Sequence, residues 1–208
     1  MKKFLVLTLL IIIIAGCSSE GDIKMINRTD HSLYFTIKGN DYILEGSENS
    51  DTKMTVSVDT GEKFLFYNEG IIEVDMYLEG ETFMMQYATI GGQPIGEYFT
   101  ETTLQVKPSE TLKVYCDPTH AGVKLINNSN QNIIDLAYRT AISDTLISII
   151  GSPIAMGDSA WSRLKATTDS DSIKYSFVIE YANGLIDSTT YINIEDLTVD
   201  EQLRIELE

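Results

Sequence analysis

Cysteine and histidine, the residues that bind zinc, are scarce in this sequence of 208 residues, which has two of each. His31 and His120 have no cysteine or second histidine nearby at the spacing of a zinc site. Zinc chemistry and histidine-based catalytic triads are therefore not expected, and we predict that both histidines are solvated polar residues. No metal and no cofactor are predicted.

Positive charge is also scarce, because 15 Lys and Arg residues stand against 31 Asp and Glu residues, a net charge of −16. An anionic surface repels phosphate backbones and anionic lipid headgroups. Nucleic acid is therefore not expected as a partner. The acidic segments 47–51 and 169–171 lack the ligand pattern of a calcium loop. No pair of carboxylates stands out as catalytic, so no catalytic residue is predicted.

A long hydrophobic run occurs once, at the N-terminus, where Lys2 and Lys3 precede residues 4–15, which are apolar except for Thr8. The run has about 12 apolar residues, whereas a membrane span needs about 20. It ends in Ile14-Ala15-Gly16-Cys17, and small residues of this kind mark a signal-peptide cleavage site. We interpret residues 1–16 as a cleaved secretion signal.

The sequence around Cys17 resembles the lipobox of bacterial lipoproteins, although that family prefers Leu where this chain has Ile14. The resemblance implies that the Cys17 thiol receives a diacylglyceryl group and that the new amine is acylated. Several acyl chains, at about 0.8 kcal/mol per buried methylene, would hold the chain on a membrane. Ser18 and the short acidic stretch after it resemble outer-membrane sorting and surface-export signals. We therefore expect a lipid-anchored protein of the outer membrane or cell surface.

The rest of the chain contains an internal repeat. Three collinear matches relate its halves: residues 23–29 with 123–129, residues 58–62 with 154–158, and residues 110–116 with 201–207, at offsets of 100, 96 and 91. A weaker hairpin match relates Tyr77 to Tyr181, although alternation places the two side chains on opposite faces. Collinear matches indicate a duplicated domain.

Apolar and polar residues alternate with a period of two in segments 72–79 and 173–181, as in half-buried strands. Turn-forming residues separate seven predicted strands in the second copy, near residues 123–128, 132–138, 144–150, 160–166, 173–181, 184–194 and 202–207. Seven short strands in about 90 residues suit an immunoglobulin-like β-sandwich. We predict an all-β chain with two tandem immunoglobulin-like β-sandwich domains after a cleaved lipoprotein signal peptide.

The predicted order is a signal peptide (1–16), a lipidated tether (17–22), β-sandwich domain 1 (23–117), a linker (118–122) and β-sandwich domain 2 (123–208). A linker of five residues leaves little freedom, so we expect an extended and fairly stiff rod.

One segment of the first copy has no counterpart in the second. If the hairpin match holds, the offset falls from 104 to 91, which leaves 13 extra residues at 91–103. Glycines and the aromatic pair in this segment suit a ligand-binding loop, with Gln93, Glu97, Tyr98 and Phe99 as candidate residues. The alternative is that Tyr98 or Phe99 covers the edge of the sandwich.

Two further residues are expected in the core. Trp161 aligns with Leu65, which favours packing in the core over a role as a sugar platform. Cys116 aligns with Leu207 and is expected to be a buried thiol without chemistry. With Cys17 lipidated, Cys116 has no cysteine left with which to form an intramolecular disulfide.

The starts of the two copies, 26–29 and 126–129, together with segments 143–146 and 154–159, resemble small Bacteroidales-type lipoproteins of the outer membrane or cell surface with tandem immunoglobulin-like domains. The resemblance implies a fold and a compartment and transfers no functional residue. It also implies O-glycosylation after aspartate, at the motif-matching hydroxyls of Thr145, Ser159, Ser172 and Ser188. The alternative is that these are turn residues at strand ends.

The expected function is that of a non-catalytic, membrane-anchored lipoprotein that binds or presents a protein or glycan partner, with its lipid as the membrane contact. The alternative is a structural pilus or fimbrial subunit. A secreted hydrolase is less favoured, because no catalytic constellation is visible in the sequence.

Overall fold

The computed structural model describes residues 20–60, 70–88, 93–168, 170–184, 186–187 and 197–208. Every regular element in these ranges is a β-strand, and none of them contains a helix that could cross a membrane. The signal segment and Cys17 lie outside the described residues, as does Ser188, so the secretion signal, the lipidation of Cys17 and the modification of Ser188 stay predictions.

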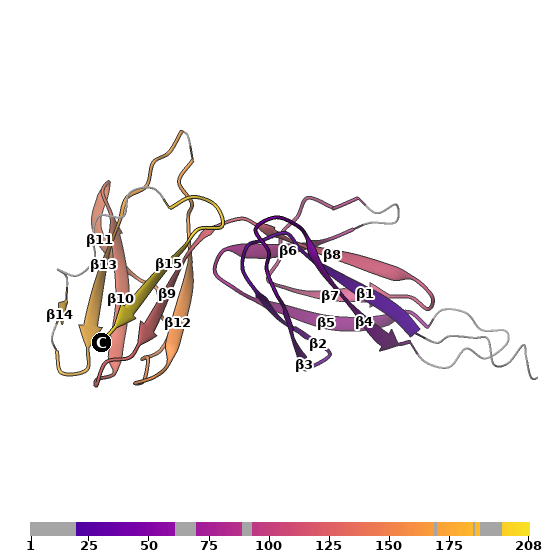
Figure 1. The fold of residues 1–208 in the computed structure, drawn as a ribbon, viewed down its shortest axis with the longest axis horizontal. Helices are drawn as coiled ribbons and strands as arrows, with labels where there is room; N and C mark the ends of the chain where they lie inside the picture. Colours follow the sequence, from indigo (N-terminus) through magenta and orange to yellow (C-terminus); the bar gives the residue numbers. More distant parts are fainter. Residues whose placement is uncertain (1–19, 61–69, 89–92, 169, 185, 188–196) are drawn as a thin grey trace, which may run out of the picture.

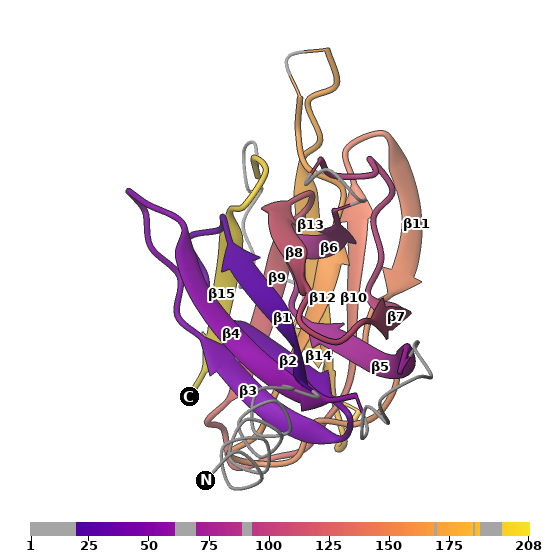
Figure 2. The ribbon, with the colours of Figure 1, turned by 90° about the vertical axis from the view of Figure 1, so that its right-hand side faces the viewer.

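The first eight strands form a β-sandwich, called the first sandwich below. Its strands are β1 (Glu20–Asn27), β2 (Leu33–Ile37), β3 (Asn40–Leu44), β4 (Thr52–Asp59), β5 (Ile72–Glu79), β6 (Phe83–Tyr87), β7 (Glu101–Val106) and β8 (Thr111–Pro118). One sheet has the order β4-β1-β8-β6, side by side in Figure 2, and the other β3-β2-β5-β7. All pairs are antiparallel except β1 with β8.

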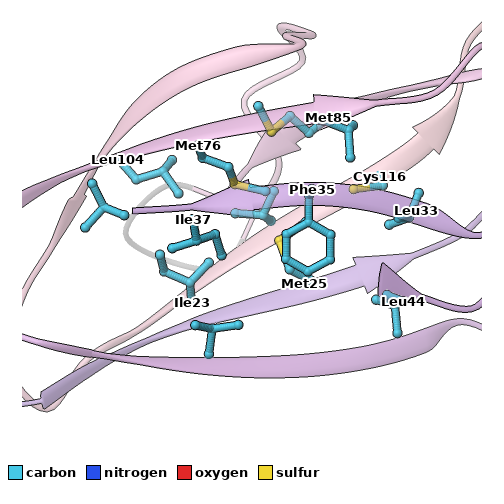
Figure 3. Packing of buried hydrophobic residues seen from close by; sticks show 14 of the residues in the cluster. Ile23, Met25, Leu33, Phe35, Ile37, Leu44, Met76, Met85, Leu104 and Cys116 are labelled. Carbon is cyan, nitrogen blue, oxygen red and sulfur yellow. The ribbon is translucent and has the colours of Figure 1, made fainter. Parts of the chain in front are cut away.

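The two sheets of the first sandwich bury one core between them (Figure 3). Alternation along each strand sends every second side chain into this core, as predicted for β5, where Val74, Met76 and Leu78 are buried. Cys116 belongs to the same core and is fully buried, which confirms its predicted packing role. Burial raises the pKa of its thiol, which favours the uncharged form.

The remaining strands form the second sandwich, which follows the first along the longest axis of the molecule (Figure 1). Its strands are β9 (Ala121–Asn127), β10 (Ile133–Thr140), β11 (Ser143–Ser148), β12 (Ser159–Leu164), β13 (Tyr175–Tyr181), β14 (Ile186–Asp187) and β15 (Gln202–Leu207). The sheets are β12-β9-β15 and β11-β10-β13-β14, with a separate core between them. The chain is therefore all-β with two tandem immunoglobulin-like sandwiches, as predicted.

A buried asparagine repeats at the same place in both sandwiches. The Asn27 amide donates to the carbonyls of His31, Leu44 and Glu45, and its oxygen accepts two bonds from Thr29. Asn127 makes five equivalent bonds, to the carbonyls of residues 131, 154 and 155 and from Ser129. The offset-100 match therefore corresponds to a buried asparagine, Asn27 or Asn127, called the shared anchor below. Its hydrogen bonds tie the end of the first strand of each sandwich to two loops.

The strand registers correct two of the other matches. Val58 pairs with Gly21 as Leu164 pairs with Ala121, so the predicted match of Val58 with Ile154 is wrong. The match rested on an apolar residue with a glycine three positions later, a pattern that is common at turns and does not identify equivalent strands.

The hairpin match is also wrong. Tyr77 pairs with Thr36 in the middle of β5, whereas Tyr181 pairs with Ile133 at the end of β13. The count of 13 extra residues therefore does not hold. Within the predicted loop, residues 101–103 belong to strand β7.

The boundaries of the strands also differ slightly from expectation. Strand β1 begins at Glu20, and Glu20 to Asp22 pair with β4, although the tether was predicted to reach residue 22. Only Thr119 and His120 lie between β8 and β9. The connection between the sandwiches is therefore shorter than the five predicted residues.

Candidate functional site

The two sandwiches are held together by backbone hydrogen bonds at their short connection. The N–H groups of Thr119 and His120 both donate to the carbonyl of Thr82, each at 2.9 Å. The Asp200 N–H donates to the carbonyl of His120 at 3.0 Å. The turn before β6, the connection and the turn before β15 are thereby tied to one another.

Side chains strengthen this interface between the sandwiches. His31 donates through Nε2 to the Asp200 carbonyl at 2.7 Å, and the Asp30 N–H donates to Asp200 Oδ2 at 2.8 Å. Gln202 donates through Nε2 to Glu81 Oε1. The prediction that both histidines are solvated is therefore wrong. His31 bonds across the interface, and burial, with the nearby positive charge of Arg163, lowers the pKa of His120.

A glycine allows the close approach of the two sandwiches. A Cβ atom at Gly122 would lie 2.4 Å from Glu81 Cγ and 2.8 Å from Glu81 Cβ. Any larger residue at this position must push the turn before β6 away from β9. The interface is therefore packed tightly at the level of the backbone.

Next to this interface lies a cavity of about 340 Å³, called the groove below. The first sandwich contributes His31, Tyr34 and Glu79 to its lining, and the second contributes Lys124, Ser159 and Trp161. Clefts between domains are common places for ligand sites. The groove exists only because the two sandwiches are held in a fixed arrangement.

Trp161 lies on the outer face of sheet β12-β9-β15, directly across from Lys124. The guanidinium carbon of Arg163 lies 5.4 Å from the centroid of the Trp161 ring, which is a cation–π distance. Within the part of the chain that the structure describes, neither the Trp161 indole N–H nor the Lys124 ammonium has a hydrogen-bond partner. Both residues line the groove.

The first sandwich faces these donors with an aromatic ring and a carboxylate. Tyr34 and Glu79 are direct partners across β2 and β5. Tyr34 is 49% exposed. The groove therefore combines two aromatic rings, from different sandwiches, with a positively charged donor, Lys124, and a negatively charged acceptor, Glu79.

The predicted core position of Trp161 is wrong, because Trp161 corresponds to Thr55 and not to Leu65, which lies outside the described residues. Trp161 pairs with Lys124, and the equivalent Lys24 pairs with Thr55. Alternation in β12 carried the correct signal, since Leu164 points inward and Trp161, three residues before it, must point outward.

The predicted ligand loop lies elsewhere, and none of its four candidate residues lines the groove. Phe99 exchanges backbone hydrogen bonds with Met85, and its ring stacks on Tyr87 with centroids 6.0 Å apart. Gln86 organises the segment by accepting from the Gly96 N–H and donating to the Tyr98 hydroxyl. Phe99 thus covers the edge of the sandwich, as in the alternative prediction, while Gln93, Glu97 and Tyr98 are exposed.

The candidate modification sites Thr145, Ser159 and Ser172 are exposed in the structure. Thr145 lies in the edge strand β11 and Ser172 in the segment before β13. Ser159 begins β12 and lines the groove, so a glycan on its hydroxyl would extend into or across that cavity. Modification of all four hydroxyls remains a prediction.

No family model matches this chain, and no curated protein matches it. Among solved structures it is similar to a major pilin (T3.2) of Streptococcus pyogenes, at 10% identity and a TM-score of 0.26 over 91% of this chain and 96% of that one. It is also similar to the tip fimbrial protein Mfa3 of Porphyromonas gingivalis, at 9% identity and a TM-score of 0.27 over 91% and 95%.

A third likeness is to the Bacillus anthracis TIE protein, at 8% identity and a TM-score of 0.27; the chain spans 34% of the length of that protein. Similarity at this level supports no conclusion about function. What the strands themselves define is a protein of two tandem immunoglobulin-like sandwiches with a groove between them.

Proposed function

We propose that this chain is a non-catalytic, lipid-anchored protein of the outer membrane or cell surface that binds a glycan in the groove. One observation carries the proposal: Trp161 and Tyr34, from different sandwiches, line the same polar cavity. Aromatic rings with a polar rim suit ligands that have both an apolar face and hydrogen-bonding edges. Sugar rings have this character.

The groups around the two rings support the same choice. Lys124 and the Trp161 indole N–H supply hydrogen-bond donors, and Glu79 supplies acceptors. The hydroxyl groups of a sugar could therefore both accept and donate hydrogen bonds in the groove. Few groups need to move on binding, because the interface already fixes both walls. A preformed site loses less free energy to ordering.

The predicted lipid on Cys17 fits this function. It would attach the first sandwich to a membrane. The full sequence has a net charge of −16, and loss of Lys2 and Lys3 with the signal leaves −18 on the mature chain, which keeps the remaining surface away from anionic headgroups. The groove would then stay open to soluble or cell-surface glycans.

Affinity gel electrophoresis tests the proposal. The mature chain is run in detergent through gels that contain starch, dextran, yeast mannan or mucin. We expect at least one polymer to retard the wild-type chain and Trp161→Ala to weaken that binding about 30-fold, the effect of losing an aromatic hot spot worth about 2 kcal/mol.

Tyr98→Ala is the matched control, because Tyr98 is 42% exposed but lies outside the groove. It should migrate like the wild-type chain. Equal retardation of Trp161→Ala and wild type, or no retardation by any of the four polymers, would contradict glycan binding in the groove.

A second candidate function, a structural pilus-type subunit, is favoured by the edge strand β11. Ile142, in the turn before it, is 82% exposed, and Leu146 and Ile147 are 52% and 47% exposed. Apolar side chains on a sheet edge promote pairing with another strand. A structural role predicts multimers of the purified chain that Leu146→Lys abolishes. A wild-type chain that is monomeric at all concentrations in light scattering argues against it.

A further inference from the structure

Two residues that line the groove, Tyr34 and Glu79, belong to the outer face of sheet β3-β2-β5-β7. Tyr34 pairs with Glu79, and Thr36 pairs with Tyr77 in the next outward-facing row. Phe35, between them on β2, is buried, so Tyr34 and Thr36 point to the same outer face. Successive rows on one face are about 7 Å apart, which makes Tyr34 and Tyr77 diagonal neighbours.

A second cavity, of about 450 Å³, begins at this next row. Thr36 and Tyr77 line it together with Asp75, Glu101 and Thr103. Tyr77 is 42% exposed and lies directly across from Glu101. The Thr103 hydroxyl donates to Asp75 Oδ1 at 2.8 Å, which orients that carboxylate. An exposed aromatic ring with neighbouring acceptors therefore repeats the pattern of the groove.

The charge of this face selects among polymers. None of the strands β2, β3, β5 and β7 contains Lys or Arg, whereas their outward positions carry five carboxylates: Asp41, Glu73, Asp75, Glu79 and Glu101. Carboxylates accept hydrogen bonds from hydroxyl groups and repel other anions. Polymers of uronic acids or phosphates are therefore disfavoured, and neutral sugars are favoured.

We propose that the groove and the second cavity are two subsites of one cleft, which follows Trp161, Tyr34 and Tyr77 and binds a linear, neutral polysaccharide longer than a disaccharide. This rests on the proposed glycan-binding function and adds the length and charge of the ligand. Trp161 is the platform of the first subsite, and Tyr77 is the platform of the second.

Calorimetry on the mature chain in detergent tests the extension. The probes are maltose and maltooctaose, isomaltose and isomaltooctaose, or mannobiose and mannooctaose, according to the polymer that retards the chain. We expect the octasaccharide to bind the wild-type chain about tenfold more tightly than the disaccharide. Tyr77→Ala should remove this difference, while Tyr77→Phe keeps it.

The outcomes separate the two proposals. If Trp161→Ala binds both oligosaccharides like the wild-type chain, the glycan-binding function itself is wrong. If Trp161→Ala weakens both but Tyr77→Ala changes neither, the function stands and the second subsite is overturned. Retardation of the wild-type chain by polygalacturonate as strong as by the neutral polymer would overturn the selection by charge.

Discussion

The two sandwiches share an internal anchor and differ on their outer faces. Asn27 and Asn127 make the same five side-chain bonds in each. At the outer positions the copies diverge, since Trp161 stands where the first sandwich has Thr55. Buried hydrogen bonds therefore maintain the fold that the two sandwiches share, whereas the candidate binding residues lie at outward positions that this fold does not constrain.

A second difference is the role of each sandwich at the groove. The first presents the ends of its strands and turns, including His31 and Glu79, whereas the second presents the flat outer face of β12-β9-β15. A duplicated fold therefore forms one site from two non-equivalent surfaces.

The largest expected effect concerns the predicted lipid on Cys17, which precedes the first sandwich in the sequence. We expect labelled palmitate to be incorporated into the wild-type chain and not into Cys17→Ala, because no other residue matches the lipobox. The labelling is measured in cells by autoradiography. A Cys17→Ala chain that is labelled as strongly as the wild type would show that the anchor lies elsewhere.

Removing the shared anchor should affect both sandwiches alike. Asn27→Ala and Asn127→Ala each leave several buried carbonyl and N–H groups without partners, so each should lower the free energy of unfolding by about 3 kcal/mol. Urea titration measures this. The exposed Asn128→Ala is the control and should change stability by less than about 0.5 kcal/mol. A loss confined to one variant would mean that the two anchors are not equivalent.

The interface should contribute less than either anchor. Asp200→Ala removes the acceptor of the Asp30 N–H, at a cost of about 1 kcal/mol. Asp200 also has a φ of 70°, a left-handed conformation that Asn tolerates well. Asp200→Asn should therefore retain most of the stability in the same titration. Equal losses in both variants would show that an uncharged acceptor oxygen cannot replace the Asp200 carboxylate.

The smallest effect on stability is expected from glycosylation, which we predict only in the second sandwich. Intact and peptide mass spectrometry of the chain from its native host should show hexose-type increments on peptides with Thr145, Ser172 or Ser188, whereas an increment on Ser159 would block the groove and contradict glycan binding there. The first sandwich should carry none. A total mass equal to polypeptide plus lipid would refute this difference between the sandwiches.

Strand positions could be predicted well because alternation is a local property of the sequence. The offset-100 and offset-91 matches also hold, as the equivalent pairings of Cys116 with Asn27 and Leu207 with Asn127 show. The position of Trp161 was missed because a false turn match overrode the alternation of its own strand. The contact of His31 with Asp200 spans 169 residues, and no local pattern encodes it.

The groove itself could not be predicted, because it depends on how two separate folds dock. Gly122 was predicted to be a linker residue. Because it has no side chain, the turn before β6 can pack closely against β9. The outer face of β5 was predicted to be polar, but the proximity of Tyr77 to Tyr34 follows only from the register with β2. Such pairings depend on tertiary structure and not on local propensity.

The groove needs both sandwiches in a fixed arrangement, because residues of both line it. Inserting a Gly-Ser-Gly-Ser segment between Thr119 and His120 separates the walls without changing either core, and the same insertion after the exposed Asn49 is the control. The decisive measurement is the affinity of both variants for the neutral polysaccharide that retards the wild-type chain. Loss of binding only in the variant with the insertion at Thr119 is the predicted result, and wild-type affinity in that variant would contradict the claim.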